Sequence, residues 1–218
     1  MKDLIPPHGG LTEPANRTVP AAEAANFRAA AAGLPRVLVS DADLSTLYRF
    51  GDGGLSPLTG PMDRETFRRV LEEEVIIRGG KAYAWTIPLA FPVDRTQAGG
   101  IQPGNTVALV NGQNEIVGTL AVRDAFPFDK MAYIKSVYGT GRTDHPGGRM
   151  VLSDPRDVLL GGDVRVLPAP MPCMRARSWR FTGRRLGPRN LERMPRSRLT
   201  APWSLRRGRR LRKRVASA

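Results

Sequence analysis

The excess of positive over negative charge in this sequence lies entirely in its last 48 residues. Residues 1–170 carry 18 Lys and Arg side chains against 19 Asp and Glu, whereas residues 171–218 carry 16 against one. The last segment also holds only seven Val, Ile, Leu and Phe residues. A highly charged segment with so few apolar side chains cannot bury a core of its own. We therefore expect one folded domain over 1–170 and a basic, mostly disordered segment over 171–218.

Cysteine usage and hydropathy indicate a soluble protein of the cytoplasm. Cys173 is the only cysteine, so one chain can build neither a disulfide framework nor a thiolate metal site. The first residues lack the apolar core of a signal peptide, and no run approaches the roughly 18 apolar residues of a membrane span. We expect no membrane partner.

Three helices and a short strand are predicted in the first 75 residues. The Ala-rich segment 23–32 predicts a helix that ends at Gly33, and Val37–Val39 predicts a strand. Leu44, Leu47, Tyr48 and Phe50 recur at helical spacing, with Asp41 or Asp43 placed to cap that helix. Residues 63–74 predict a helix capped by Asp63.

From residue 81 onward the pattern is mainly that of strands. Aromatic and aliphatic residues alternate from Tyr83 to Phe91, which predicts one strand with a buried aromatic face, closed by Pro92. Residues 107–110 and 116–122 predict a hairpin, with Asn111-Gly112 supplying positive φ angles. A helix over 129–137 and a strand over 164–167 follow. The predicted class is α+β, with helices first and then a small sheet or barrel.

Four blocks of the sequence resemble the N-terminal domain of the ATP sulfurylase (sulfate adenylyltransferase) family. They are Leu4-Ile5-Pro6-Pro7-His8-Gly9-Gly10-Leu11, Gly54-Leu55-Ser56-Pro57-Leu58-Thr59-Gly60-Pro61-Met62, Trp85-Thr86-Ile87-Pro88-Leu89, and Tyr138-Gly139-Thr140 followed by Asp144-His145-Pro146-Gly147. The blocks occur in the order typical of that family, and the resemblance covers Leu4 to Leu167. It implies a PUA-like fold, which in this family is a scaffold that packs against a catalytic domain and helps subunits assemble.

The resemblance also implies a reaction, the conversion of ATP and sulfate to adenylyl sulfate and pyrophosphate in sulfate assimilation. The family performs it in a second domain that carries Gln-x-Arg-Asn, His-x-x-His and Gly-Arg-Asp patterns, and none of these follows Leu167 here. ATP as substrate and Mg²⁺ are therefore expected only for an intact family member. For this chain we expect no catalytic, cofactor-binding or metal site, and inactivity when it is alone.

Individual residues that could carry chemistry have simpler structural interpretations. His8 and His145 each lie beside Pro and Gly, which favours a role in holding loops over catalysis without a partner. Gly9-Gly10 and Gly53-Gly54 lack phosphate-loop spacing and indicate turns. Glu72-Glu73-Glu74 cannot converge on one cation if they are helical, and Cys173 has no histidine nearby in the sequence.

Two hypotheses address the basic segment 171–218. It has the arginine-rich composition of GC-rich coding DNA translated in a wrong reading frame, so the chain could be a truncated or frameshifted family member. Alternatively, Arg206–Arg214 is a nucleic-acid-binding arm, with Trp179, Phe181 and Trp203 available to stack on bases. Such an arm would bind polyanions without sequence specificity.

Two further roles concern protein partners. The domain could dock on an intact family member as a non-catalytic assembly subunit. An interface left bare by a missing catalytic domain would also expose an apolar patch and favour self-association.

Overall fold

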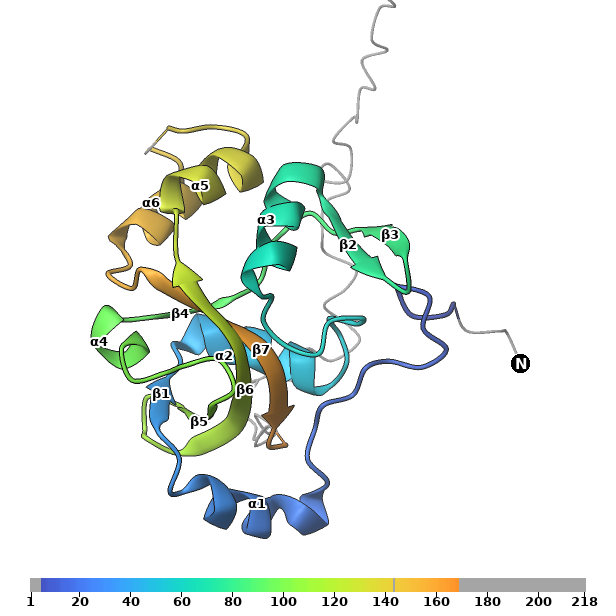
Figure 1. Cartoon of the computed structure of the whole chain (residues 1–218), viewed down its shortest axis with the longest axis vertical. Coiled ribbons are helices and arrows are strands. Elements are labelled where there is room, and N and C mark those ends of the chain that lie inside the picture. Colours follow the sequence, from blue (N-terminus) through green and yellow to red (C-terminus); the bar gives the residue numbers. More distant parts are fainter. Residues whose placement is uncertain (1–4, 143, 169–218) are drawn as a thin grey trace, which may run out of the picture. The chain divides into compact units, whose positions relative to one another are not determined.

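The structure, a computed structural model, describes residues 5–142 and 144–168 (Figure 1). A mixed sheet of five strands forms its centre in the order β1-β5-β6-β7-β4, and β2 and β3 form a separate hairpin. The strands are β1 (Arg36–Leu38), β2 (Val75–Arg78), β3 (Lys81–Ala84), β4 (Phe91–Val93), β5 (Thr106–Val110), β6 (Ile116–Pro127) and β7 (Val158–Val166).

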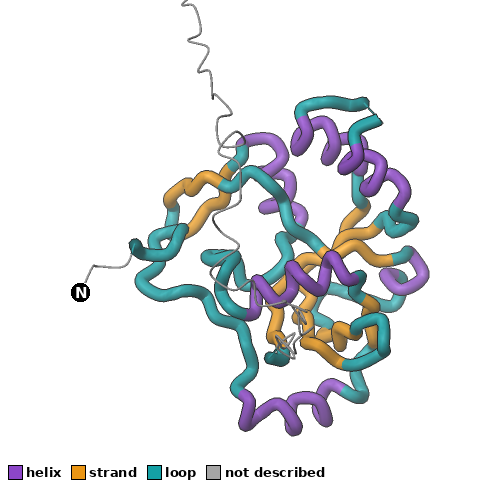
Figure 2. Tube along the Cα trace, turned by 180° about the vertical axis from the view of Figure 1, so that it is seen from behind, coloured by secondary structure: helices purple, strands orange, loops and turns teal. Residues whose placement is uncertain are grey.

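The helices lie between and around these strands. They are the 3-10 helix η1 (Ala21–Glu23) and the α-helices α1 (Ala24–Ala31), α2 (Asp41–Gly51), α3 (Arg64–Glu73), α4 (Arg95–Ala98), α5 (Lys130–Tyr138) and α6 (Pro146–Ser153). Helices α3, α5 and α6 gather at one end of the sheet, and α1 lies at the other (Figure 1). The hairpin β2–β3 projects beside α3, away from the main sheet (Figure 2).

The antiparallel pair β6–β7 is the longest pairing in the sheet. Its register runs from Gly118 opposite Val166 to Pro127 opposite Val158, with an irregularity between Val122 and Asp124. Strand β1 adds in parallel to β5, and β4 adds antiparallel to β7. Strand β7 therefore has a hydrogen-bonded neighbour on both sides along its first three residues.

Two apolar clusters form the core, and β7 contributes to both. The first cluster packs α2 against the sheet through Leu47 and Phe50, and it includes Leu160 and Val164 of β7. The second packs α3 against the far end of β6 and β7 through Phe67, Phe126 and Leu159. Since neighbouring residues of a strand point to opposite faces, Leu159 and Leu160 join the two clusters across one sheet.

The loop before α3 lies directly on the backbone of β7. The amide of Gly162 donates to the carbonyl of Pro61 (2.8 Å), and that of Val164 donates to Thr59 (3.0 Å). A Cβ atom on Gly161 would lie 2.7 Å from the Cα atom of Asp63, and one on Gly60 would meet the Gly162 carbonyl. Glycine is needed at these crossings because the two backbones touch.

The predicted strand from Tyr83 to Phe91 is wrong. Lys81–Ala84 pairs with the unpredicted strand β2, whereas Phe91–Val93 pairs with β7 in the other sheet. Pro92 lies inside β4 instead of closing a strand, and Ile87 is 50% exposed. The chain between the two strands bends because residues 85–90 connect different sheets, so alternation in the sequence does not mark one continuous face.

The turn of the predicted hairpin also differs from expectation. Strands β5 and β6 do pair, but the positive φ of their connection is at Asn114 (60°), not at Asn111-Gly112. The connection spans five residues, and Asn111 organises it by accepting hydrogen bonds from the amides of Gln113 and Glu115 through Oδ1. A longer loop of this kind does not need the two positive φ angles of a two-residue turn.

The helix predictions agree more closely with the structure. The N-cap of α2 is Ser40 and not Asp41 or Asp43, because Asp43 occupies the third helical position and completes a capping box with Ser40. Asp63 caps α3 as predicted, accepting from the amide of Thr66 (2.9 Å). Helices α4 and α6 and strand β2 were not predicted. The α+β class is confirmed. Helix α5 lies between strands where the sequence predicts a helix over 129–137, and the unpredicted α6 follows it there.

Gly161→Ala should lower the free energy of unfolding by about 1–3 kcal/mol, because the new methyl group overpacks the crossing with the Met62–Asp63 backbone. Gly112→Ala is the matched control, since no atom lies within 4 Å of a Cβ there, and its effect should stay within about 0.5 kcal/mol. Urea denaturation of the two variants makes the comparison. Equal stability of both would show that the crossing is not tightly packed.

Candidate functional site

Three of the four sequence blocks that resemble the sulfate adenylyltransferase family meet in space. His8 of the first block lies against Tyr83 and Trp85, with ring centroids 5.7 and 6.1 Å away, and Trp85 opens the third block. A Cβ on Gly9 would meet the ring of Pro57, which belongs to the second block. We call His8, Gly9, Pro57, Tyr83 and Trp85 the motif cluster.

Hydrogen bonds hold the motif cluster in place. His8 donates from Nε2 to the carbonyl of Ala84 (2.9 Å), and Arg78 donates from Nη1 to the carbonyl of Gly9 (3.1 Å). Gly9 has a φ of +83°, a value that glycine adopts readily. The histidine thus fixes the N-terminal segment to β3, and the glycine makes the turn that brings that segment against Pro57.

The fourth block lies elsewhere, at the start of α6. His145 is the N-cap of that helix, and its Nδ1 accepts a hydrogen bond from the amide of Gly148 (3.4 Å). Its ring lies 4.6 Å from that of Tyr138 at the end of α5. Hydrogen bonds from Arg142 hold the pKa of the neighbouring Asp144 below its ordinary value. His8 and His145 therefore belong to different surfaces and do not form one site.

The other residues singled out in the sequence also have structural roles. Gly53 has a φ of +77° in the turn after α2. Glu72 pairs with Arg68 (3.6 Å) on the exposed face of α3, and Glu74 ends that helix in a left-handed conformation. Cys173 and the basic segment, with its proposed nucleic-acid arm, lie outside the described residues.

A group of metal-ligating side chains would be another kind of candidate site. Over residues 5–142 and 144–168, no three His, Cys, Asp or Glu side chains lie close enough together to hold a metal ion. Within the same ranges, no helix is long and apolar enough to span a bilayer.

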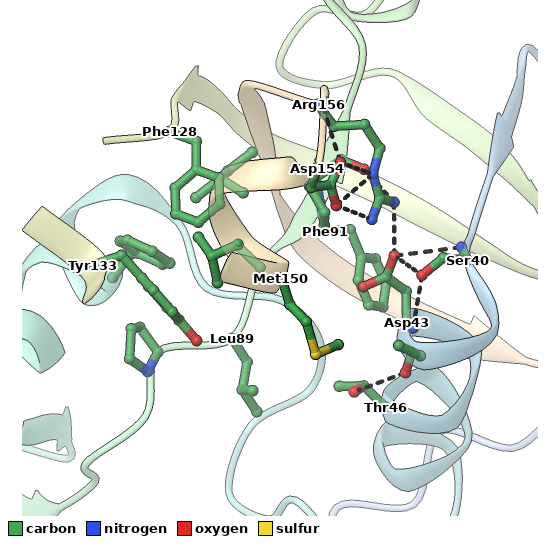
Figure 3. Close-up of a pocket in the computed structure, with 17 residues that line it drawn as sticks. Ser40, Asp43, Thr46, Leu89, Phe91, Phe128, Tyr133, Met150, Asp154 and Arg156 are labelled. Atoms are coloured by element: carbon green, nitrogen blue, oxygen red, sulfur yellow. Dashed lines mark hydrogen bonds and ion pairs between the residues drawn. The ribbon is translucent and has the colours of Figure 1, made fainter. Parts of the chain in front are cut away.

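A cavity of about 300 Å³ is bounded by α2, β4, α5 and α6 (Figure 3). Its apolar wall includes the side chains of Leu89, Phe91, Phe128 and Tyr133. Met150 of α6 lies at its rim and is 71% exposed. Sequence patterns gave no sign of this cavity, since its lining comes from five separate stretches of the chain.

Arg156 closes one end of the cavity by joining three elements. Its Nη1 donates to Asp43 Oδ2 of α2 (2.8 Å) and to the carbonyl of Pro92 in β4 (3.2 Å). Its Nε and Nη2 donate to the carboxylate of Asp154, which follows α6 (2.9 and 2.6 Å). Ser40 Oγ completes this Arg156 clamp by donating to Asp43 Oδ2 (2.6 Å). Figure 3 shows the clamp beside the cavity.

The hydrogen bonds of the clamp shift the pKa values of Asp154 and Arg156. Hydrogen bonds from Arg156 lower the pKa of Asp154, against the opposing effect of burial. The hydrogen bond to Asp154 raises the pKa of Arg156, so that this side chain stays charged at any accessible pH. On the opposite wall, burial is the main cause of a raised pKa for Tyr133.

Comparison with known proteins identifies the relatives of this domain. The family model for the PUA-like domain matches residues 5–169. A sulfate adenylyltransferase of Pyropia yezoensis is 46% identical over 167 residues, which make up 77% of this chain and 38% of that protein. A sulfate adenylyltransferase of Synechococcus sp. (strain JA-3-3Ab) is 35% identical over 165 residues, or 76% of this chain and 40% of that protein.

The matched region makes up most of this chain but less than half of each relative. The chain spans about 40% of their length, and the match is to their N-terminal part. Among solved structures, the hexameric APS kinase from Thiobacillus denitrificans superimposes with a TM-score of 0.57 at 21% identity, covering 79% of this chain and 29% of that one. At that identity the likeness concerns the fold alone.

Arg156→Met should lower the free energy of unfolding by about 1–3 kcal/mol near pH 7, because it leaves two half-buried carboxylates without their cation. Folding lowers the pKa of Asp154. The stability that its carboxylate gives the folded state is therefore fully present above the ordinary Asp pKa and is lost as the pH falls through the lowered value. The difference between wild type and variant should therefore shrink as the pH falls below about 4.

The control is Arg95→Met, since Arg95 pairs with Asp157 at 2.6 Å but is 80% exposed. Its loss should cost at most about 1 kcal/mol. Denaturation curves for both variants at several pH values give the comparison. Equal effects of the two substitutions would contradict the clamp.

Proposed function

This chain belongs to the PUA-like domain family, in the form found as the N-terminal part of sulfate adenylyltransferases, and we propose that it serves sulfate activation as the non-catalytic domain of such an enzyme. The whole enzyme would be a nucleotidyltransferase that joins ATP and sulfate to give adenylyl sulfate and pyrophosphate. The match of residues 5–169 to that domain carries this proposal. With a single cysteine, the protein suits a reducing cytoplasm.

The proposed division of labour follows from the chemistry. Sulfate and the α-phosphate of ATP are both anions, so their joining requires cationic and hydrogen-bonding groups preorganised around the developing charge. In this domain, Arg156 is already bound to Asp43 and Asp154, and Arg78 donates to the backbone of Gly9. His8 and His145 make structural hydrogen bonds on separate surfaces. We assign the chemical step to a catalytic domain that this one supports.

The motif cluster is the feature best suited to that support. It joins the N-terminal segment, the loop on β7 and the hairpin β2–β3 through contacts between residues far apart in the sequence. Such contacts fix three loops relative to the central sheet. We propose that the family retains these blocks because they shape a rigid frame on which a catalytic domain is positioned, not because they touch ATP or sulfate.

Self-association is the second part of the proposal. Helices α5 and α6 pack on each other and expose three apolar side chains, Met131 (49%), Met150 (71%) and Leu152 (36%). Apolar side chains exposed to solvent favour contact with another protein surface. We propose that copies of this chain associate through α5 and α6.

Purified protein should release no pyrophosphate from ATP and sulfate above a blank without enzyme, and none with molybdate in place of sulfate. The reason is that the chemical step is assigned to a separate catalytic domain. A coupled pyrophosphate assay at micromolar protein makes the measurement. Turnover that scales with protein concentration would overturn the assignment of this domain as non-catalytic.

Sedimentation should depend on protein concentration in the wild type and become that of a monomer in the double variant Met131→Lys/Leu152→Lys, because two added charges oppose burial of the α5–α6 surface. Ile87→Lys is the control, since Ile87 is 50% exposed but lies outside these helices. Analytical ultracentrifugation gives the readout. A wild type that sediments as a monomer at every concentration would contradict the proposed association.

A further inference from the structure

The cavity beside the Arg156 clamp has the size and the lining of a small-molecule site. Its volume of about 300 Å³ lies at the lower end of the range for ligand pockets. Aromatic and aliphatic side chains form most of the wall, and a few polar groups lie at two places on it. Flat apolar molecules suit such walls because aromatic rings stack on one another or meet edge to face.

One polar group that faces the cavity is the carboxylate of Asp43. Ser40 and Arg156 both direct their hydrogen bonds to its Oδ2 atom (2.6 and 2.8 Å). Across the described chain, no hydrogen bond reaches its Oδ1 atom, and no fully buried side-chain oxygen lacks a partner. Oδ1 is therefore accessible to solvent, and Figure 3 shows it on the cavity side of the clamp. A carboxylate oxygen accepts hydrogen bonds, so this end of the cavity selects a donor.

The second polar group is the hydroxyl of Tyr133. It lines the cavity from the α5 side, next to Leu89 (Figure 3). No partner for this hydroxyl is found among residues 5–142 and 144–168, and by the same reasoning it is open to solvent. It can donate a hydrogen bond to an oxygen of a ligand or accept one from it.

Anions are disfavoured at the clamp even though an arginine is present. All three nitrogen atoms of the Arg156 guanidinium already donate to protein oxygens, with distances from 2.6 to 3.2 Å. Arg156 pairs with two carboxylates, those of Asp43 and Asp154. Lys130 donates to the backbone carbonyl of Asp154, and its charge also lowers the pKa of that residue. The free acceptor at Asp43 Oδ1 therefore faces the ligand.

We propose that this cavity binds a small aromatic amine, with its ring against Leu89 and Met150 and its ammonium group on Asp43 Oδ1. A hydroxyl on the far end of the ring would meet Tyr133. The flexible thioether of Met150 lies at the rim and can adapt to different rings. No group that binds ATP or sulfate takes part in this site, but Met150 also belongs to the α5–α6 surface through which copies of the chain are proposed to associate.

The test uses the full chain and three probes of similar size. Tyramine carries the amine and the ring hydroxyl, phenethylamine lacks the hydroxyl, and 3-(4-hydroxyphenyl)propanoate replaces the amine with a carboxylate. Titrations followed by ¹H–¹⁵N NMR should give a dissociation constant on the order of 1 mM for tyramine, as expected for a ten-atom ligand. The carboxylate probe should bind at least about tenfold more weakly, because it lacks the charge-assisted hydrogen bond.

Substitutions outside the Arg156 clamp test whether tyramine binds in this cavity. Ala42 lines the cavity from an exposed position on α2, so Ala42→Trp should fill the mouth and weaken tyramine binding at least about tenfold. Ala30→Trp is the matched control, because Ala30 is equally an exposed helix alanine but lies on α1, which does not line the cavity. It should leave the dissociation constant unchanged.

Tyr133→Phe tests the second polar contact. It should bring the affinity for tyramine down about two- to tenfold, to that of phenethylamine, and leave phenethylamine itself unaffected. Equal binding of tyramine and the carboxylate probe would overturn the proposal. So would equal effects of Ala42→Trp and Ala30→Trp, or the absence of any saturable shift with tyramine.

Discussion

The contact between the loop 59–63 and strand β7 is the constraint on which the rest of this structure depends. Gly60 and Gly161 let two backbones touch, and the amides of Gly162 and Val164 bond across to the loop. Strand β7 joins β6 to β4 and supplies side chains to both core clusters. The same loop carries Pro57 to the motif cluster and leads into α3. This contact between the loop and β7 therefore positions the sheet, the core and the motif cluster relative to one another.

Local signals predicted the helices better than the strands. Asp63 at a helix start and the apolar spacing of α2 act within a few residues, so the sequence alone indicates them. The alternation from Tyr83 to Phe91 was misleading because its two halves pair with different partners, β2 and β7. Pairing is decided by residues far away in the sequence, and a short strand such as β2 carries little pattern of its own.

The same reasoning explains which site residues could be found. The blocks around His8, Pro57 and Trp85 were visible in the sequence, but their meeting in space was not. The Arg156 clamp and its cavity gave no signal, since Asp43 and Arg156 are 113 positions apart and each looks like an ordinary surface charge. Tertiary contact makes them a unit, in which a half-buried arginine holds two carboxylates and leaves one oxygen facing a cavity.

If this domain performs the structural part of a sulfate adenylyltransferase, it should replace the corresponding part of a relative. In the chimera that tests this, residues 1–168 replace the matched N-terminal part of the Pyropia yezoensis enzyme, which is 46% identical over that part. The chimera should release pyrophosphate from ATP and sulfate at a rate within about tenfold of the parent enzyme, since the catalytic domain is unchanged. A chimera that folds and purifies like the parent but shows no turnover would contradict this structural role.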